Sequence, residues 1–173
     1  MKPYSHCPCC GSPLVDKHTE GRVRQVCSAC DFIFYQNPAP AAGVVLIENS
    51  EVLLVKRKYE PNEGGWTLPA GFVEMEEDVE SCAVREMKEE TNLDVELTGI
   101  FQIYSAFDDP RASVVLILFL GRRTGSREDL ACGDDASDAR FFHIDEIPAN
   151  IAFQAHRDAL KQVKLYISAQ LNL

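Results

Sequence analysis

The sequence of 173 residues lacks long apolar runs and has few basic residues. No stretch of about 18 apolar residues occurs, so we expect no transmembrane helix. Residues 1–10, MKPYSHCPCC, lack the apolar core of a signal peptide, and we therefore expect a cytoplasmic protein. The 17 Lys and Arg residues are outnumbered by 27 Asp and Glu residues, and this net charge of −10 argues against a general nucleic-acid binder.

Seven cysteines are present, and their spacing indicates a metal site rather than a set of disulfides. Two C-x2-C pairs are separated by sixteen residues, which is the pattern of a zinc ribbon with four thiolate ligands. Cys9 is left over, because it cannot keep this spacing. The predicted zinc ligands are Cys7, Cys10, Cys27 and Cys30.

We expect this zinc to be structural, since four thiolates leave no open position for water. The predicted ribbon, residues 1–37, is too short to have much core of its own, so metal binding would supply its folding energy. A role as a scaffold, a dimer contact or a wall of a substrate site is favoured over nucleic-acid binding, because the ribbon has few basic residues.

Residues 38–173 predict a second domain with a mixed sheet and at least two helices. The proline-bearing segment 36–40 leads into a hairpin of apolar, β-branched residues. Two later strands are separated by the turn sequence DDPR, and an amphipathic helix follows from about residue 153. The predicted strands of this domain are 43–47, 52–56, 97–107, 113–120 and 140–144, with a loop at 122–138, whereas those of the ribbon are 22–26 and 32–35. His156 is expected to be a structural histidine.

Residues 71–93, GFVEMEEDVESCAVREMKEETNL, hold eight carboxylates. Glu86, Glu89 and Glu90 are spaced three and four apart, so a helix places them on one face. At about 100° per residue, Glu86 and Glu90 fall within the apolar stripe that Cys82 marks. A solvated acidic helix is the alternative, but carboxylates that are buried together need a compensating cation. The pattern therefore favours a divalent metal site.

The same stretch resembles the Nudix box, G-x5-E-x7-R-E-U-x-E-E-x-G-U, in which U is a bulky apolar residue. It starts at Gly71, and every fixed position is met except one, where Asn92 replaces glycine. This position ends the helix, and we expect it to adopt the left-handed conformation, which asparagine tolerates well.

The resemblance implies an α/β/α sandwich with a mixed sheet, preceded by the small zinc ribbon. It also implies hydrolysis of a diphosphate with Mg2+ or Mn2+ as the cofactor. The main metal ligands would be Glu86 and Glu90, with help from Glu89 and from the carbonyl of Gly71. The resemblance further implies that Arg85 pairs with Glu77 and orients the cluster.

Substrate contacts and the general base are less well defined by the sequence. We expect Arg57 to help bind phosphate, and Trp66 and Glu74 are further candidates for substrate binding. Trp66 can equally be a residue of the core. The candidates for the general base are Glu77, Glu89, Glu128, Asp129, Asp134 and Asp135. Glu89 is preferred among these.

The four-cysteine ribbon, the QNP linker and the segment WTLPAGFVE together are similar to the Nudix hydrolases that carry a zinc ribbon. NADH pyrophosphatases of this group have an SQPWPFP-like signature, which residues 99–111 lack. The resemblance therefore implies hydrolysis of ADP-ribose or FAD with release of AMP. An NADH pyrophosphatase and a non-catalytic nucleotide sensor remain the alternatives, although the intact segment REMKEE disfavours a sensor. A homodimer is left open.

Overall fold

The computed structural model describes residues 4–133 and 135–171. The chain divides into two compact units, Met1–Pro38 and Ala39–Leu173. Their boundary lies within the proline-bearing segment 36–40. No helix in the described part of the chain is long and apolar enough to span a membrane.

The first unit is a three-stranded antiparallel sheet of β1 (Leu14–Thr19), β2 (Arg22–Cys27) and β3 (Ile33–Phe34). The sequence did not predict β1, because its residues do not alternate between apolar and polar. The strand forms by pairing with β2 across the turn Glu20–Gly21. Both turn residues have positive φ values of 51° and 75°, as a tight hairpin requires.

The second unit contains a seven-stranded mixed sheet, which confirms the predicted fold class. Five strands lie in the order β10-β5-β4-β9-β8, while β6 pairs with β5 and β7 pairs with β4. Strands β4 and β9 are parallel, and the other pairs are antiparallel. The strands are β4 (Ala39–Glu48), β5 (Glu51–Arg57), β6 (Trp66–Thr67), β7 (Ala70–Phe72), β8 (Val95–Ala106), β9 (Val114–Arg123) and β10 (Ala136–His143).

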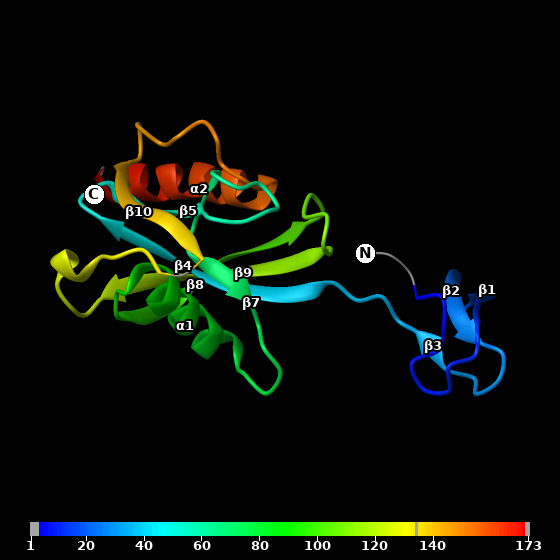
Figure 1. The fold of residues 1–173 in the computed structure, drawn as a ribbon. Helices are drawn as coiled ribbons and strands as arrows, with labels where there is room; N and C mark the ends of the chain where they lie inside the picture. The colour runs from blue at the N-terminus through cyan, green and yellow to red at the C-terminus, as the bar shows by residue number, and fades with distance from the viewer. Residues whose placement is uncertain (1–3, 134, 172–173) are drawn as a thin grey trace. The chain divides into compact units, whose positions relative to one another are not determined.

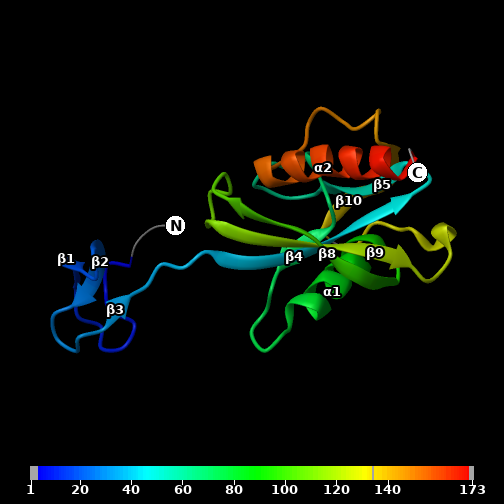
Figure 2. The same cartoon turned by 180° about the vertical axis from the view of Figure 1, so that it is seen from behind.

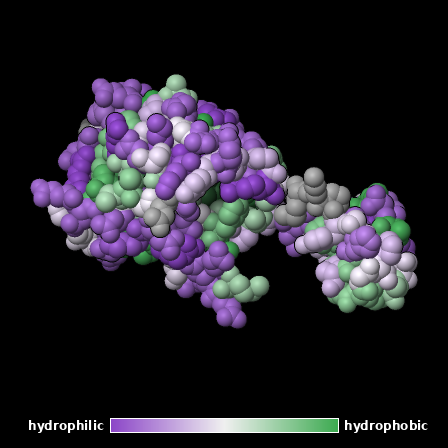
Figure 3. All heavy atoms as spheres, in the orientation of Figure 1, coloured by the Kyte–Doolittle hydropathy of each residue, from purple (hydrophilic) through white to green (hydrophobic). Residues whose placement is uncertain are grey.

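Helices α1 (Val79–Thr91) and α2 (Gln154–Leu171) lie on opposite sides of this sheet (Figures 1 and 2). Residues of α1 such as Met87 share one buried cluster with β4, whereas residues of α2 such as Val163 belong to a second cluster. The visible surface of this unit is mostly hydrophilic (Figure 3). The arrangement is the predicted α/β/α sandwich.

Both ends of α1 are fixed by local interactions. The side chain of Asp78 accepts a hydrogen bond of 2.8 Å from the Ser81 amide at the first turn. At the last turn Asn92 has φ 58°, and its amide donates to the Lys88 carbonyl at 2.9 Å. The predicted left-handed conformation of Asn92 is confirmed.

The predicted loop 122–138 was too long. It contains the short helix η1 (Arg127–Asp129), and β10 begins at Ala136 rather than at Arg140. The early part of β10 pairs with the end of β5 through a register shift between Ala136 and Asp138. Such an irregular pairing hides the alternation that identifies a strand.

Candidate functional site

Strand β7 and helix α1 bring two carboxylates against one stretch of backbone. A Cβ atom at Gly71 would lie 2.1 Å from the carboxylate carbon of Glu86, so only glycine allows this close approach. One residue earlier, the Ala70 amide donates to Oε2 of Glu90 at 3.0 Å. The β7 backbone therefore binds Glu90 and lies close to Glu86, and both glutamates are partly buried as predicted.

Arg85 holds the remaining part of the cluster together. Its Nε and Nη2 donate to the two carboxylate oxygens of Glu77 at 2.7 and 2.9 Å. Its Nη1 reaches Glu86 at 2.7 Å and Glu89 at 2.9 Å, and Nη2 also donates to the Phe72 carbonyl at 3.2 Å. The guanidinium thus contacts three of the box carboxylates and the end of β7.

The carboxylates of this cluster have different electrostatic surroundings. The hydrogen bonds from Arg85 lower the pKa of Glu77 to about 2. Burial, followed by the charge of Glu86, raises the pKa of Glu90 to about 8, and burial also raises the pKa of Glu86. Glu86 and Glu90 would be more stable as anions beside a further cation. These carboxylates and the Gly71 carbonyl are hard oxygen donors of the type that suits Mg2+ or Mn2+.

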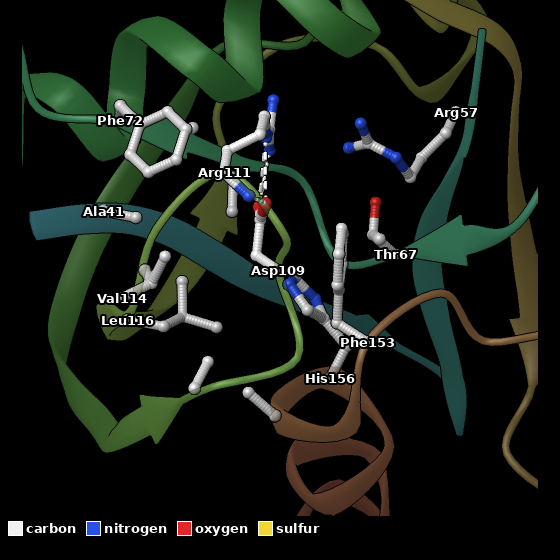
Figure 4. A pocket seen from close by; sticks show the side chains of 14 residues that line it. Ala41, Arg57, Thr67, Phe72, Asp109, Arg111, Val114, Leu116, Phe153 and His156 are labelled. Carbon is white, nitrogen blue, oxygen red and sulfur yellow. Dashed lines mark hydrogen bonds and ion pairs between the residues drawn. The ribbon is translucent and has the colours of Figure 1, made fainter. Parts of the chain in front are cut away.

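A pocket adjoins this cluster, since Ala70 and Gly71 form part of its wall (Figure 4). Its other residues come from β4, β5, β6, β9, the end of β7, the start of α2 with the residue before it, and the segment from Ala106 to Arg111. The wall is formed by Ala41, Arg57, Thr67, Ala70, Gly71, Phe72, Ala106, Asp109, Arg111, Val114, Leu116, Phe153, Ala155 and His156.

The three predicted substrate contacts lie in different surroundings from one another. Arg57, at the end of β5, lines the pocket. Trp66 is 7% exposed, packs edge-on against Phe142 at 4.8 Å between ring centroids, and is not part of the pocket wall. Glu74 is exposed, and its amide donates to Glu77.

The candidates for the general base also differ in position. Glu89 is 59% exposed in its side chain and binds Arg85. Asp129 lies in η1 and accepts a hydrogen bond from the Ser126 amide, and Glu128 is its neighbour. The charge of Asp135 contributes to the pKa values of both Arg57 and Glu90, so this carboxylate is near the cluster. Asp134 lies outside the described residues.

Sequence reasoning missed Asp109, Arg111 and Phe153 in the pocket wall. The segment 108–111 was interpreted only as a turn, and nothing local in its sequence indicated that it faces β7. His156 was expected to be structural, and this is confirmed: it is buried, and its Nδ1 accepts a hydrogen bond from the Leu68 amide at 3.1 Å. Burial lowers the pKa of His156 to about 4.

The first unit brings its two C-x2-C pairs together. Their four Sγ atoms lie within 4.8 Å of one another, and the closest pairs are 3.5 and 3.6 Å apart. A tetrahedral zinc with bonds of about 2.3 Å requires sulfur atoms about 3.8 Å apart, so the cluster fits this ion. Each pair begins with the same turn, in which a backbone amide donates to Cys7 or Cys27 Sγ at 3.4 Å. Cys9 lies outside the cluster.

Comparisons with known proteins agree with this architecture. The sequence model of the NUDIX domain matches residues 37–163. An ADP-ribose pyrophosphatase of Methanocaldococcus jannaschii is 40% identical over 128 residues, which are 73% of each chain. The NAD-capped RNA hydrolase NudC of Stutzerimonas stutzeri is 30% identical over 97% of this chain. That match covers 58% of NudC, so the present chain spans little more than half of this relative.

A crystal structure of a NUDIX hydrolase from Nitrosomonas europaea is similar along most of the chain. It has a TM-score of 0.79 and 35% sequence identity, and the match covers 91% of this chain and 89% of the other. The fold and the acidic helix facing β7 define a hydrolase of the NUDIX class, and the chain belongs to this family. Within the family it is a Nudix pyrophosphohydrolase.

Proposed function

We propose that the protein hydrolyses the diphosphate bond of a nucleoside diphosphate that is linked to another moiety. ADP-ribose and FAD are the proposed substrates, and AMP is the common product. The observation that carries this proposal is the placement of Glu86 beside Gly71 and of Glu90 on the Ala70 amide, next to an arginine-bearing pocket. The relative from M. jannaschii, described as an ADP-ribose pyrophosphatase, supports this choice of substrate.

In this proposal Glu86, Glu90 and the Gly71 carbonyl hold Mg2+ or Mn2+, with help from Glu89. A divalent cation there would neutralise charge on the diphosphate and lower the pKa of a water molecule. Arg85 keeps the Glu86 and Glu89 side chains in place, while Glu77 orients Arg85. Glu89, which is exposed beside the cluster, is the proposed general base, and Arg57 is the proposed phosphate contact.

The first unit is proposed to be a structural zinc ribbon, residues 1–37, ahead of a hydrolase domain at 38–173. Its zinc would be bound by Cys7, Cys10, Cys27 and Cys30, which leaves no coordination position for a substrate. We therefore assign no step of hydrolysis to the ribbon.

The test is a Glu86→Gln substitution, with ADP-ribose, FAD and NADH as substrates and with Mg2+ or Mn2+ present. The amide keeps the size of the side chain but removes its charge, and we expect kcat/KM to fall by roughly 100-fold or more. Glu80→Gln is the matched control, because Glu80 is an exposed residue in the first turn of the same helix. Undiminished turnover in Glu86→Gln would contradict the proposal.

The identity of the preferred substrate separates the remaining alternatives. The NudC relatives, described as NAD-capped RNA hydrolases, make the NADH type the second candidate. Higher kcat/KM for NADH than for ADP-ribose and FAD would select it. Binding of nucleotide without any product would favour a sensor.

A further inference from the structure

Arg57 is a partly buried cation that forms no ion pair with a carboxylate among the described residues. Its Nε donates to the Pro61 carbonyl at 2.8 Å and its Nη2 to the Tyr59 carbonyl at 3.4 Å. Within residues 4–133 and 135–171, no acidic side chain forms an ion pair with it. Burial lowers its pKa and the charge of Arg111 lowers it further, while the charges of Glu90, Asp109 and Asp135 oppose this shift only in part. A guanidinium in this position would be stabilised by a bound anion.

Arg111 faces the same pocket but is fixed by a carboxylate. Its Nε donates to Oδ1 of Asp109 at 3.0 Å, and its Nη2 donates to Oδ2 at 2.7 Å. The Asp109 side chain is only 7% exposed, whereas that of Arg111 is 47% exposed. The neighbouring Asp108 accepts a hydrogen bond of 2.7 Å from the Gln154 amide, which ties this segment to the start of α2. The position of the Arg111 guanidinium is therefore preorganised.

The two guanidinium groups approach one another across the pocket. Figure 4 shows the end of Arg57 pointing toward Arg111, with Asp109 below them. Each lies over a phenyl ring, since Arg57 is 5.2 Å from the Phe153 centroid and Arg111 is 5.2 Å from the Phe72 centroid. Each arginine covers one face of its ring, so that face is not open to a stacked nucleobase. An anion between the arginines would remove their mutual repulsion.

We propose that Arg57 and Arg111 form a two-arginine clamp for the diphosphate of the substrate, and that Asp109 is the positioning residue of Arg111. The clamp rests on the proposed function. Gly71 belongs to both the pocket wall and the carboxylate cluster, so a diphosphate can contact the two at once. Guanidinium groups suit phosphate because they donate two parallel hydrogen bonds. The clamp thus adds Arg111, together with its positioning residue Asp109, to Arg57 as determinants of diphosphate binding.

The first test compares the binding of ADP and AMP to the full chain by calorimetry with Mg2+ present. Arg111→Gln should weaken ADP binding by roughly tenfold or more, and AMP binding by clearly less, because AMP has one phosphate. Arg111→Lys keeps the charge and should lie between the wild type and Arg111→Gln. Unchanged ADP affinity, or an equal loss for ADP and AMP, would overturn the clamp.

Arg140→Gln is the matched control. Arg140 pairs with Asp138 two residues earlier, as Arg111 pairs with Asp109, but it is exposed and is not part of the pocket wall. It should bind ADP and AMP like the wild type. Thermal unfolding of all variants shows whether the fold is retained.

The second test separates the clamp from the proposed function. With ADP-ribose, Asp109→Asn should raise KM by roughly fivefold and change kcat by less than about twofold, because it loosens Arg111 without removing it. In the double variant, Asp109→Asn should raise KM little beyond the value for Arg111→Gln alone. If ADP-ribose is hydrolysed and both variants keep the wild-type KM, the clamp is wrong while the proposed function stands. If no substrate is hydrolysed, the proposed function fails, and the ADP and AMP measurements still decide whether the clamp exists.

Discussion

The two candidate metal sites of this chain differ in how they depend on the fold around them. In the ribbon the thiols of two short turns converge, and the only other buried apolar side chain described in that unit is Val26. In the second unit the carboxylates stand on a helix whose buried side packs against the sheet through residues such as Ala83 and Met87. We expect metal binding at the first site to help fold the unit around it, whereas the second site is attached to a core that exists without it.

The two sites also differ in whether a basic side chain balances the negative charge of their ligands. Arg85 already supplies one cation to the carboxylate cluster, so this cluster can persist without a metal. The cluster of possible metal ligands in the first unit consists of four cysteines. A metal should therefore determine folding in the first unit and chemistry in the second.

The largest expected effect is the loss of the ribbon fold when its zinc is removed. In the full chain, Cys27→Ser should abolish the dispersed amide signals of residues 14–34 and leave those of the second unit unchanged. Structural zinc contributes roughly 10–16 kcal/mol in modules of this kind, far more than one buried valine. The measurement is a two-dimensional amide NMR spectrum.

Cys9→Ser is the control for this change, since Cys9 lies outside the cluster. Its spectrum should keep the dispersed signals. A dispersed ribbon spectrum for Cys27→Ser would show that the first unit folds without four thiolates and would remove the contrast between the sites.

A smaller effect is expected at Glu90, and it concerns pH. Its pKa is raised to about 8 in the folded state without a divalent cation, from an ordinary value of 4.5. Between these values the folded chain binds more protons than the unfolded chain, so this group makes stability fall as the pH rises. Added Mg2+ should oppose that fall because it binds the ionised carboxylate.

Glu90→Gln removes this titration. Without added Mg2+ and with zinc retained, its melting temperature should exceed that of the wild type at pH 8 by about 2–4 °C or more. The gain should shrink toward pH 5, where Glu90 is protonated in the folded wild type. Thermal unfolding at several pH values measures this, with Glu80→Gln as the control. An equal shift at pH 5 and pH 8 would mean that the amide acts through packing rather than through charge.

The acidic helix could be predicted from the sequence because its signals are local. The apolar spacing of Val79, Cys82 and Ala83 and the turn at Asn92 belong to one helix of 13 residues and its end. The periodicity also placed Glu86 and Glu90 correctly on its inner side. Such features depend on bonds between residues at most a few positions apart.

The rest of the site depends on contacts that the sequence does not encode locally. The Gly133 amide donates to the Glu90 carbonyl at 3.1 Å, and the Ala131 amide donates to the Thr91 carbonyl at 3.1 Å, some forty positions apart in the chain. Arg111 likewise reaches the pocket only because β8 and β9 pair and Asp108 binds the start of α2. No periodicity within 108–111 or 122–138 indicates these contacts, so the first segment was predicted only as a turn and the second only as a loop.

The smallest expected effect is at Asn92, which ends the helix that carries the carboxylates and has no part in the proposed chemistry. Its φ of 58° disfavours most side chains with a Cβ but asparagine less than others, and its Nδ2 donates to the Asp129 carbonyl at 2.9 Å. Asn92→Ala loses this bond and must still adopt the left-handed conformation, so we expect a loss of about 2 kcal/mol. Asn92→Gly loses the bond but relieves the strain, and its loss should stay below about 1 kcal/mol.

Urea unfolding of the second unit measures both Asn92 variants, and kcat for ADP-ribose should stay within about twofold of the wild type in each. If glycine were as destabilising as alanine, the bond to Asp129 rather than the backbone conformation would account for asparagine at this position. If kcat instead fell while stability held, the end of α1 would be part of the catalytic machinery. The second site would then depend on the structure at the end of α1, as the ribbon is proposed to depend on its zinc.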